Sequence, residues 1–214
     1  MGRLVTVATH LAVFAAVAVW LSEGGHRAEQ ADAARREAQY RALDLVHTVA
    51  GRKDDGGRLG ALEDLAADGV SLERLPLAHA VLPGARLGGA RLDGSTLSGA
   101  KLSSATLAGA SLRGADLSAA DLEGADLRNA DLSGARLTGV RASGAVLAGA
   151  DLARADLNGA DLSGVDLRDT RGLTYRQLDG ACGDSTTRLP VGLSVRPCTV
   201  AVGEAWTTTD RYGD

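Results

Sequence analysis

The stretch of residues 80–169 decides the fold, and its central part, residues 115–134, reads ADLSAADLEGADLRNADLSG. Leucine recurs at every fifth position from Leu72 to Leu167, and Ala142 is the one departure from this rule. A small residue, most often alanine, precedes almost every one of these leucines by two positions. Because a period of five fits neither an α-helix nor a flat strand, the repeat indicates a solenoid.

Five residues can form one side of a four-sided coil, so that residues twenty apart stack directly on one another. The leucine and the small residue before it then both face a narrow interior. At the spacing of paired strands, about 4.8 Å, the repeat predicts about five coils in a column of roughly 20–25 Å. Glycines such as Gly94 and Gly124 suit the corners, where tight turns need a positive φ. The predicted core leucines are Leu87, Leu92, Leu97, Leu102, Leu107, Leu112, Leu117, Leu122, Leu127, Leu132, Leu137, Leu147, Leu152, Leu157, Leu162 and Leu167.

The departure at Ala142 supports this packing scheme. Val140 occupies the small inward position of the same side, so the large and small residues are exchanged there. Such an exchange roughly conserves the volume of the side, and a filled core tolerates volume-conserving changes best.

These units, such as residues 125–127 and 160–162 (both ADL), resemble those of the pentapeptide-repeat family. The resemblance implies an all-β solenoid, a right-handed quadrilateral β-helix. Residues 40–42, 57–65, 68–72 and 82–84 look like the lead-in of bacterial membrane-associated members. Residues 182–193 resemble the ending common among proteobacterial members.

The N-terminal residues predict a membrane segment. Residues 4–21 form an apolar run without formal charge, which is close to the minimum length for a helix that crosses a bilayer. A signal sequence is the alternative, because Arg3 provides a short basic region. The run is long for a signal sequence, however, and no small-residue cleavage site follows it closely. We therefore expect an uncleaved single-pass anchor in the bacterial inner membrane.

The sidedness of the C-terminal domain stays open at this point. Arginines that follow the run, among them Arg27, Arg35 and Arg36, favour a cytoplasmic domain by the positive-inside rule. Cys182 and Cys198 favour the periplasm, where they would form a disulfide that stabilises by about 3 kcal/mol. In the cytoplasm they would be ordinary thiols.

The chain divides into six predicted segments. They are an anchor or signal sequence (1–22), a helical stem and linker (23–57), an N-terminal cap with the first coil (58–79), the β-helix (80–170), a C-terminal cap (171–198) and a loose tail (199–214). Within the caps we expect short helices over residues 59–67 and 173–181, the second with Leu173, Leu178 and Ala181 inward. Caps are needed because an open coil end presents unpaired N–H and C=O groups. The five-residue register is expected to end after Asp169.

Aspartate recurs at the outward position before the leucine. One interpretation is a DNA mimic that modulates DNA gyrase, as some members of the resembled family do. The other is that aspartate bonds the backbone of the adjacent turn. Stacking at twenty residues gives columns of alternating charge, namely Thr96, Asp116, Arg136 and Asp156, and Lys101, Asp121, Arg141 and Asp161. Alternating charge disfavours DNA mimicry, which needs uninterrupted negative potential.

No catalytic, cofactor or metal site is predicted. The four histidines, His10, His26, His47 and His79, form no constellation with a nucleophile or an acid, and the glycines repeat for architectural reasons. A net charge of −4 is too mild to imply a partner. We therefore expect a membrane-anchored, non-enzymatic scaffold with an unidentified protein partner or self-association, and no nucleic acid. Gyrase modulation is the alternative.

Overall fold

The computed structural model describes residues 57–198. Before them it describes only a few scattered residues, namely 30, 33–34, 36–38, 40–42 and 44. Those earlier positions are helical, and Arg41 forms an ion pair with Glu37 there. The predicted membrane segment (4–21), most of the stem and linker, and the tail (199–214) lie outside the described residues.

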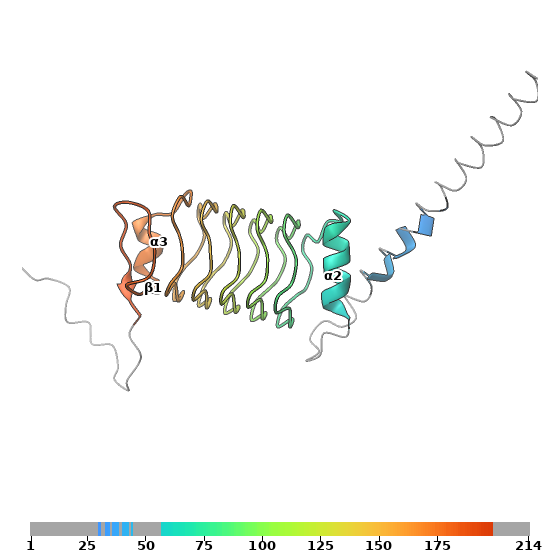
Figure 1. The fold of residues 1–214 in the computed structure, drawn as a ribbon, viewed down its shortest axis with the longest axis horizontal. Helices are drawn as coiled ribbons and strands as arrows, with labels where there is room; N and C mark the ends of the chain where they lie inside the picture. The colour runs from blue at the N-terminus through green and yellow to red at the C-terminus, as the bar shows by residue number, and fades with distance from the viewer. Residues whose placement is uncertain are drawn as a thin grey trace, which may run out of the picture.

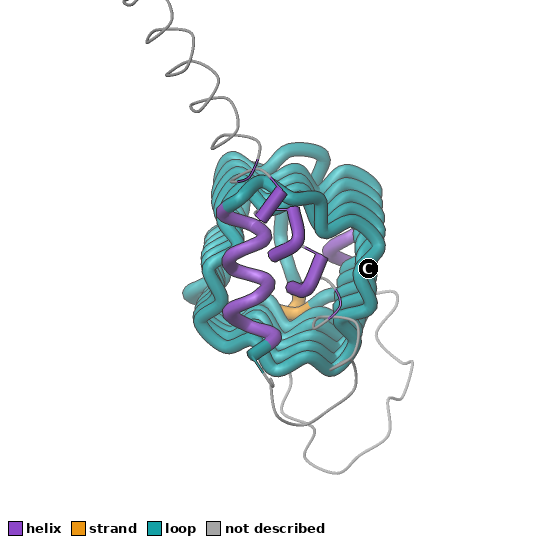
Figure 2. The backbone as a smooth tube through the Cα atoms, turned by 90° about the vertical axis from the view of Figure 1, so that its right-hand side faces the viewer, coloured by secondary structure: helices purple, strands orange, loops and turns teal. Residues whose placement is uncertain are grey.

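Residues 72–171 form a column of stacked four-sided coils, with a helix at each end (Figure 1). Parallel bridges join residues twenty apart, from Pro76 with Thr96 to Asp151 with Arg171. A view along the column shows the square outline and α2 crossing its open end (Figure 2). The backbone is thus the quadrilateral β-helix that the five-residue period predicts.

Each side of a coil uses its backbone groups in the same way. The N–H of Leu127 donates to the carbonyl of Val146 at 2.8 Å, and the N–H of Val146 donates to the carbonyl of Ala125 at 2.9 Å. A turn then closes the side, with the N–H of Ala130 donating to the carbonyl of Leu127 at 3.1 Å. This ladder satisfies most backbone N–H groups of each side without long strands.

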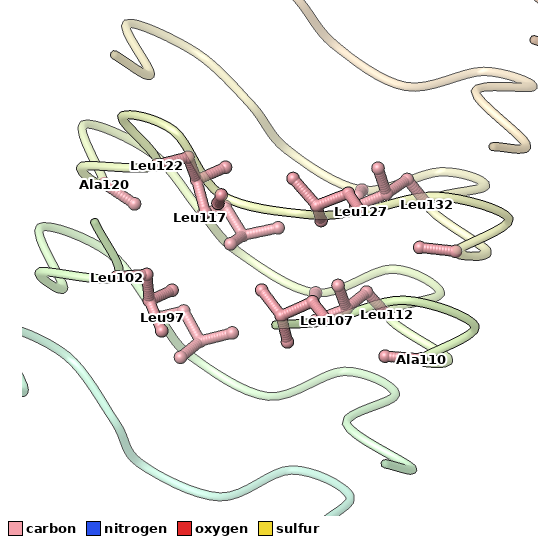
Figure 3. Close-up of a cluster of buried hydrophobic side chains, with 14 of the residues drawn as sticks. Leu97, Leu102, Leu107, Ala110, Leu112, Leu117, Ala120, Leu122, Leu127 and Leu132 are labelled. Carbon is pink, nitrogen blue, oxygen red and sulfur yellow. The ribbon is translucent and has the colours of Figure 1, made fainter. Parts of the chain in front are cut away.

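The interior is a shaft of leucines and alanines. Leucines from successive coils lie above one another, and alanines fill the remaining space (Figure 3). Each predicted core leucine from Leu87 to Leu167 is at most 4% exposed. Val140 and Ala142 are both buried. Ser95 stands at an alanine position, and its buried hydroxyl has no hydrogen-bond partner.

The third residue of every turn in the column has a positive φ. Glycine occupies most of these positions, as expected, but seven carry side chains. Ala119, with φ 55, lies between Gly99 and Gly139 in one corner column. The coil geometry therefore imposes this conformation even where the residue disfavours it.

At the N-terminal end, α2 (Arg58–Ala67) covers the first coil with Leu62 and Leu65, both buried. The side chain of Arg58 is also buried, and its Nη2 donates to the carbonyl of Pro76 at 2.5 Å. Arg58 thus joins the helix to the coil, a contact that the apolar pattern did not predict. Leu75 adds bulk at a position where later coils have Ser95 and alanines.

The C-terminal end departs from the repeat. The inward leucine pattern stops at Leu167, whereas the backbone ladder extends to Arg171, which still pairs with Asp151. The ladder uses backbone atoms and tolerates any outward side chain. α3 (Tyr175–Asp179) then replaces one side of the last coil and buries its own Leu178. Bridging resumes with shifted register, from Asp161 to Cys182 and from Asp166 to Arg188.

The segment of residues 182–198 forms a loop whose two ends are joined. β1 (Cys182–Gly183) pairs in parallel with β2 (Arg196–Pro197), and a disulfide joins Cys182 to Cys198. The side chain of Arg196 also donates to the carbonyl of Asp179. These contacts fold residues 184–195 back against the end of the column.

Candidate functional site: the outward columns of the coil

The exposed surface of the coil consists of four outward columns, defined by the residues that precede the inward leucines. We name each column by its member in the second coil, which comprises residues 92–111. They are the Thr96 column (Thr96, Asp116, Arg136, Asp156), the Lys101 column (Lys101, Asp121, Arg141, Asp161), the Thr106 column (Thr106, Asp126, Val146, Asp166) and the Ser111 column (Ser111, Asp131, Asp151, Arg171).

The column aspartates are bonded to their own turns. In all eight, Oδ1 accepts the backbone N–H of the residue two positions later, over 2.9–3.2 Å. This turn bond explains why aspartate recurs at the position, because the carboxylate satisfies an amide that the ladder leaves free. The aspartates are Asp116, Asp121, Asp126, Asp131, Asp151, Asp156, Asp161 and Asp166.

Ion pairs link neighbouring coils where the charges alternate. Arg136 Nη1 lies 3.3 Å from Asp116 Oδ2, and Arg141 Nη2 lies 2.7 Å from Asp121 Oδ2. The arginine side chains are mostly exposed, so each pair contributes only about 0–1 kcal/mol to stability. Their main effect is to prevent repulsion between stacked carboxylates.

Two columns that the sequence analysis did not compare lack this alternation. Asp131 and Asp151 are stacked neighbours, and the nearest cation to Asp131 among the ion pairs is Arg113, at 3.8 Å. In the Thr106 column, Val146 separates Asp126 from Asp166. The i+20 rule applied to all four sides would have found both departures.

In the Thr106 column, arginines within the same turn neutralise the aspartates. Arg128 Nη2 lies 2.6 Å from Asp126, and Arg168 Nη2 lies 2.7 Å from Asp166. The hydrogen bond from Arg168 lowers the pKa of Asp166 to about 2, against the effect of partial burial. The equivalent bond from Arg128 lowers the pKa of Asp126. These carboxylates stay ionised and paired at neutral pH.

A shallow depression of about 250 Å³ lies beside the Thr96 column. It follows the corner where Gly114 and Gly134 have no side chains, below the exposed Arg154. Arg136, Asp116 and Asp156 contribute charges of both signs. Its lining holds no nucleophile beside a general base, so this depression can offer polar contacts but no evident catalysis.

The structure brings the two cysteines close to the carboxylate of Asp161. Cys182 and Cys198 are disulfide-bonded, and Asp161 Oδ1 lies 3.3 Å from Cys198 Sγ. The sequence analysis missed Asp161 here, although Cys182 follows it by twenty-one residues, close to one coil. His79 is exposed at a turn and joins no cluster of potential metal ligands within the described part of the chain.

The sequence profile described as Pentapeptide repeats matches residues 71–107, 97–134 and 130–169, with eight copies. Proteins that carry such repeats fold as right-handed quadrilateral β-helices, as the coil described above does in its four-sided outline. No curated protein matches the chain.

Several solved structures are similar. A pentapeptide repeat protein from the Arabidopsis thaliana thylakoid lumen is 31% identical, over 54% of this chain and 83% of that one, with a TM-score of 0.47. A pentapeptide repeat protein from Nostoc PCC 7120 is 34% identical, over 63% and 87%, with a TM-score of 0.26. The plasmid-mediated fluoroquinolone resistance protein QnrB1 is 25% identical, over 51% and 62%, with a TM-score of 0.26.

Proposed function

Because this chain belongs to the pentapeptide-repeat family, we propose that it is a non-enzymatic scaffold or protein-interaction module at the bacterial inner membrane. Proteins of this family are generally structural or interaction modules rather than enzymes. The partner is a protein or a second copy of this chain.

The observation that carries the proposal is that the column charges are fixed in place. Each column aspartate is held by its own turn, and the ladder fixes the spacing between coils. A surface whose polar groups are already ordered loses little conformational entropy when it binds. Such a rigid pattern of mixed charges suits recognition of a protein surface of complementary charge.

The anchor part of the proposal depends on residues 4–21. Their apolar composition supports a membrane helix, and the rest of the chain would then be presented from the bilayer by the stem. Among the residues that the structure describes, no helix is both long enough and apolar enough to span a bilayer. The prediction of an anchor therefore depends on the sequence alone.

Gyrase modulation, the alternative, requires a surface that resembles the DNA backbone. Positive charges at Arg136 and Arg141 interrupt the Thr96 and Lys101 columns, and the arginines of the same turns neutralise the aspartates of the Thr106 column. Only the stacked pair Asp131 and Asp151 in the Ser111 column is not interrupted. Lys101 and the exposed Arg91 add positive charge near the first coils. These features favour the scaffold over the mimic.

Site-specific photocrosslinking in cells tests the scaffold directly. A photoreactive residue is placed at Thr96, Lys101, Thr106 or Ser111, one position in each of the four columns, in the full-length chain. We expect a discrete crosslinked product from one column and none from the others. Equal products from all columns, or none from any, would contradict a specific interaction surface.

Two further measurements separate the parts of the proposal. Removal of residues 1–22 should release the protein from the inner-membrane fraction, and retention would contradict the anchor. The charge reversal Arg141→Glu in the Lys101 column, with Arg136→Glu in the Thr96 column as the matched control, should weaken the crosslink only when the substituted column is the one that binds the partner. Inhibition or protection of purified gyrase in a supercoiling assay would favour the rival function.

A further inference from the structure

The C-terminal end of the column gathers three potential metal ligands. The Sγ atoms of Cys182 and Cys198 and a carboxylate oxygen of Asp161 all lie within 4.8 Å of one another. All three residues are half-buried. The hydroxyl of Ser163 also lies 3.4 Å from Cys198 Sγ. The two cysteines are joined by the disulfide in this arrangement.

Backbone bonds hold these residues in place independently of the disulfide. The N–H of Cys182 donates to the carbonyl of Ala160 at 3.0 Å, and its own carbonyl accepts from Leu162 at 2.8 Å. The N–H of Cys198 donates to the carbonyl of Gly183 at 2.8 Å. Opening the sulfur–sulfur bond would therefore leave both thiols close together.

Asp161 is held by its turn as well. Its Oδ1 accepts the N–H of Ser163 at 3.0 Å, as the other column aspartates do in their own turns. Asp161 differs from them because the next coil places cysteine above it, where the Lys101 column otherwise continues with charged residues. The carboxylate thus faces sulfur.

We propose that reduction of the disulfide turns this cluster into a binding site for a soft divalent cation such as zinc, with Cys182, Cys198 and Asp161 as ligands. Thiolate sulfur and carboxylate oxygen are both established ligands of zinc, and three protein ligands leave a fourth tetrahedral position for water. Harder cations such as magnesium prefer sites made of oxygen alone, so the two sulfurs select against them.

The chemistry balances with a dithiol reductant. The reductant supplies two electrons and two protons, the sulfur–sulfur bond breaks, and two thiols form while the reductant becomes a disulfide. The cation then replaces both thiol protons, which pass to solvent, and two metal–sulfur bonds form. Its two positive charges offset the two thiolates.

The C-terminal segment of residues 182–198 can therefore be cross-linked in two alternative ways. Under oxidising conditions the disulfide ties β2 to β1, and under reducing conditions the cation does so through the same two sulfurs. An open coil end exposes unpaired backbone groups, so either closure protects the column from end-to-end association.

Cobalt(II) is a suitable probe, because thiolate ligation gives charge-transfer absorption and tetrahedral ligation gives intense visible bands. The full-length chain in detergent micelles is reduced with a dithiol, freed of excess reductant without oxygen, and titrated with cobalt(II) alone. We expect saturable absorption, release of protons, and displacement of cobalt by zinc. The oxidised chain should show none of these.

Asp161→Asn provides the decisive variant. An asparagine oxygen can still accept the N–H of Ser163, so the turn is kept while the anionic ligand is lost. We expect cobalt affinity to fall by at least about tenfold, by analogy with the loss of weaker, outer contacts to a metal ligand. Asp121→Asn is the matched control, since Asp121 makes the same turn bond to Glu123 in the same column, away from the cysteines.

Two results would overturn the proposal. One is the absence of charge-transfer absorption in a reduced chain whose circular dichroism is unchanged. The other is equal cobalt affinity in Asp161→Asn and Asp121→Asn, which would show that Asp161 is not a ligand. Cys182→Ser should weaken the charge-transfer absorption, because one of the two thiolates is lost, and an unchanged band and affinity in this variant would show that Cys182 is not a ligand.

Discussion

The middle coils and the C-terminal end are built on the same shaft but held together differently. In the middle, every side repeats the same ladder bonds, such as that of Leu127 with Val146, and each side with an aspartate adds a turn bond such as that from Arg128 to Asp126. At the end, single long-range contacts replace the repeat. Gln177 donates to the carbonyls of Leu152 and Ala155 at 2.7 and 3.0 Å, where α3 interrupts the ladder.

Asp184 shows how a side chain replaces a missing backbone partner. In the regular coils, a turn amide such as that of Gly144 donates to a carbonyl of the next coil, here that of Ser163. The amide of Gly164 instead donates to Asp184 Oδ1 at 3.0 Å. Regular coils thus tolerate variation, whereas the end depends on individual side chains.

The largest expected effect is a cavity in the shaft. Leu127→Ala should lower the free energy of unfolding by about 3–5 kcal/mol, because coils on both sides prevent collapse into the space. Leu178→Ala in α3 should cost about 2–3 kcal/mol, because a terminal helix can settle. Urea unfolding of the full-length chain, followed by circular dichroism, measures both. Equal losses would remove the distinction between the two regions.

The exchanged pair tests whether volume is shared across one side of a coil. Val140→Ala and Ala142→Leu should each destabilise by about 1–3 kcal/mol, the first through a cavity and the second through overpacking. The double variant restores the regular pattern and should recover at least about 1 kcal/mol of the summed loss. Strict additivity in a double-mutant cycle would show that the two positions pack independently.

Acid should destabilise the C-terminal end more than the middle coils. Hydrogen bonds from Thr186 and from the amide of Gly164 lower the pKa of Asp184 to about 2. Because the ordinary value is about 3.9, the stabilisation from this carboxylate is complete above that pH and is lost as pH falls toward 2. Asp184→Asn should therefore weaken protection of the Gly164 amide at pH 7 but match the parent near pH 2, as hydrogen exchange can measure.

Asp116→Asn is the control for this pH dependence. Its pKa is also lowered, first by Ser118 and then by Arg136, so the sign is the same. Asp116 lies in a regular turn, however, in which backbone hydrogen bonds to the neighbouring coil, such as that of Ala119 with Thr138, remain when the side chain changes. The loss of hydrogen-exchange protection at the Ser118 amide in Asp116→Asn should be smaller than the loss at the Gly164 amide in Asp184→Asn. A larger loss there would contradict the view that the end depends more on single side chains.

The smallest effect concerns the corners. Ala119→Gly should stabilise the chain by about 0.5–1 kcal/mol, since relief of a left-handed backbone slightly exceeds the entropy that glycine adds to the unfolded state. Gly139→Ala, one coil away, should destabilise by a similar amount, because its added Cβ meets no atom within 4 Å and only the backbone is strained. Thermal unfolding of both variants checks the sign.

Sequence reasoning predicted the coil because its evidence is periodic. Leucine at every fifth position defines the inward direction and the stacking partner of residues such as Leu127 at once. The turn bond of the aspartates was one of two interpretations, and the structure has it at every A-D-L unit. The bond spans only two residues, so its geometry is local.

Other features had no periodic signal. The buried Arg58 looks like a surface residue in the sequence, and its bond to Pro76 depends on where α2 lies. The approach of Asp161 to the cysteines depends on how many residues the interruption by α3 adds to one coil. Neither quantity can be read from composition.

By itself, the sequence determined the cross-section of this protein, because one short unit repeated many times leaves a single way to bury its leucines. Only the tertiary structure decided how the column ends. A cap is made once, from contacts between residues such as Thr187 and Leu162 that the twenty-residue stacking does not relate, and its geometry follows from the packing of the finished coil.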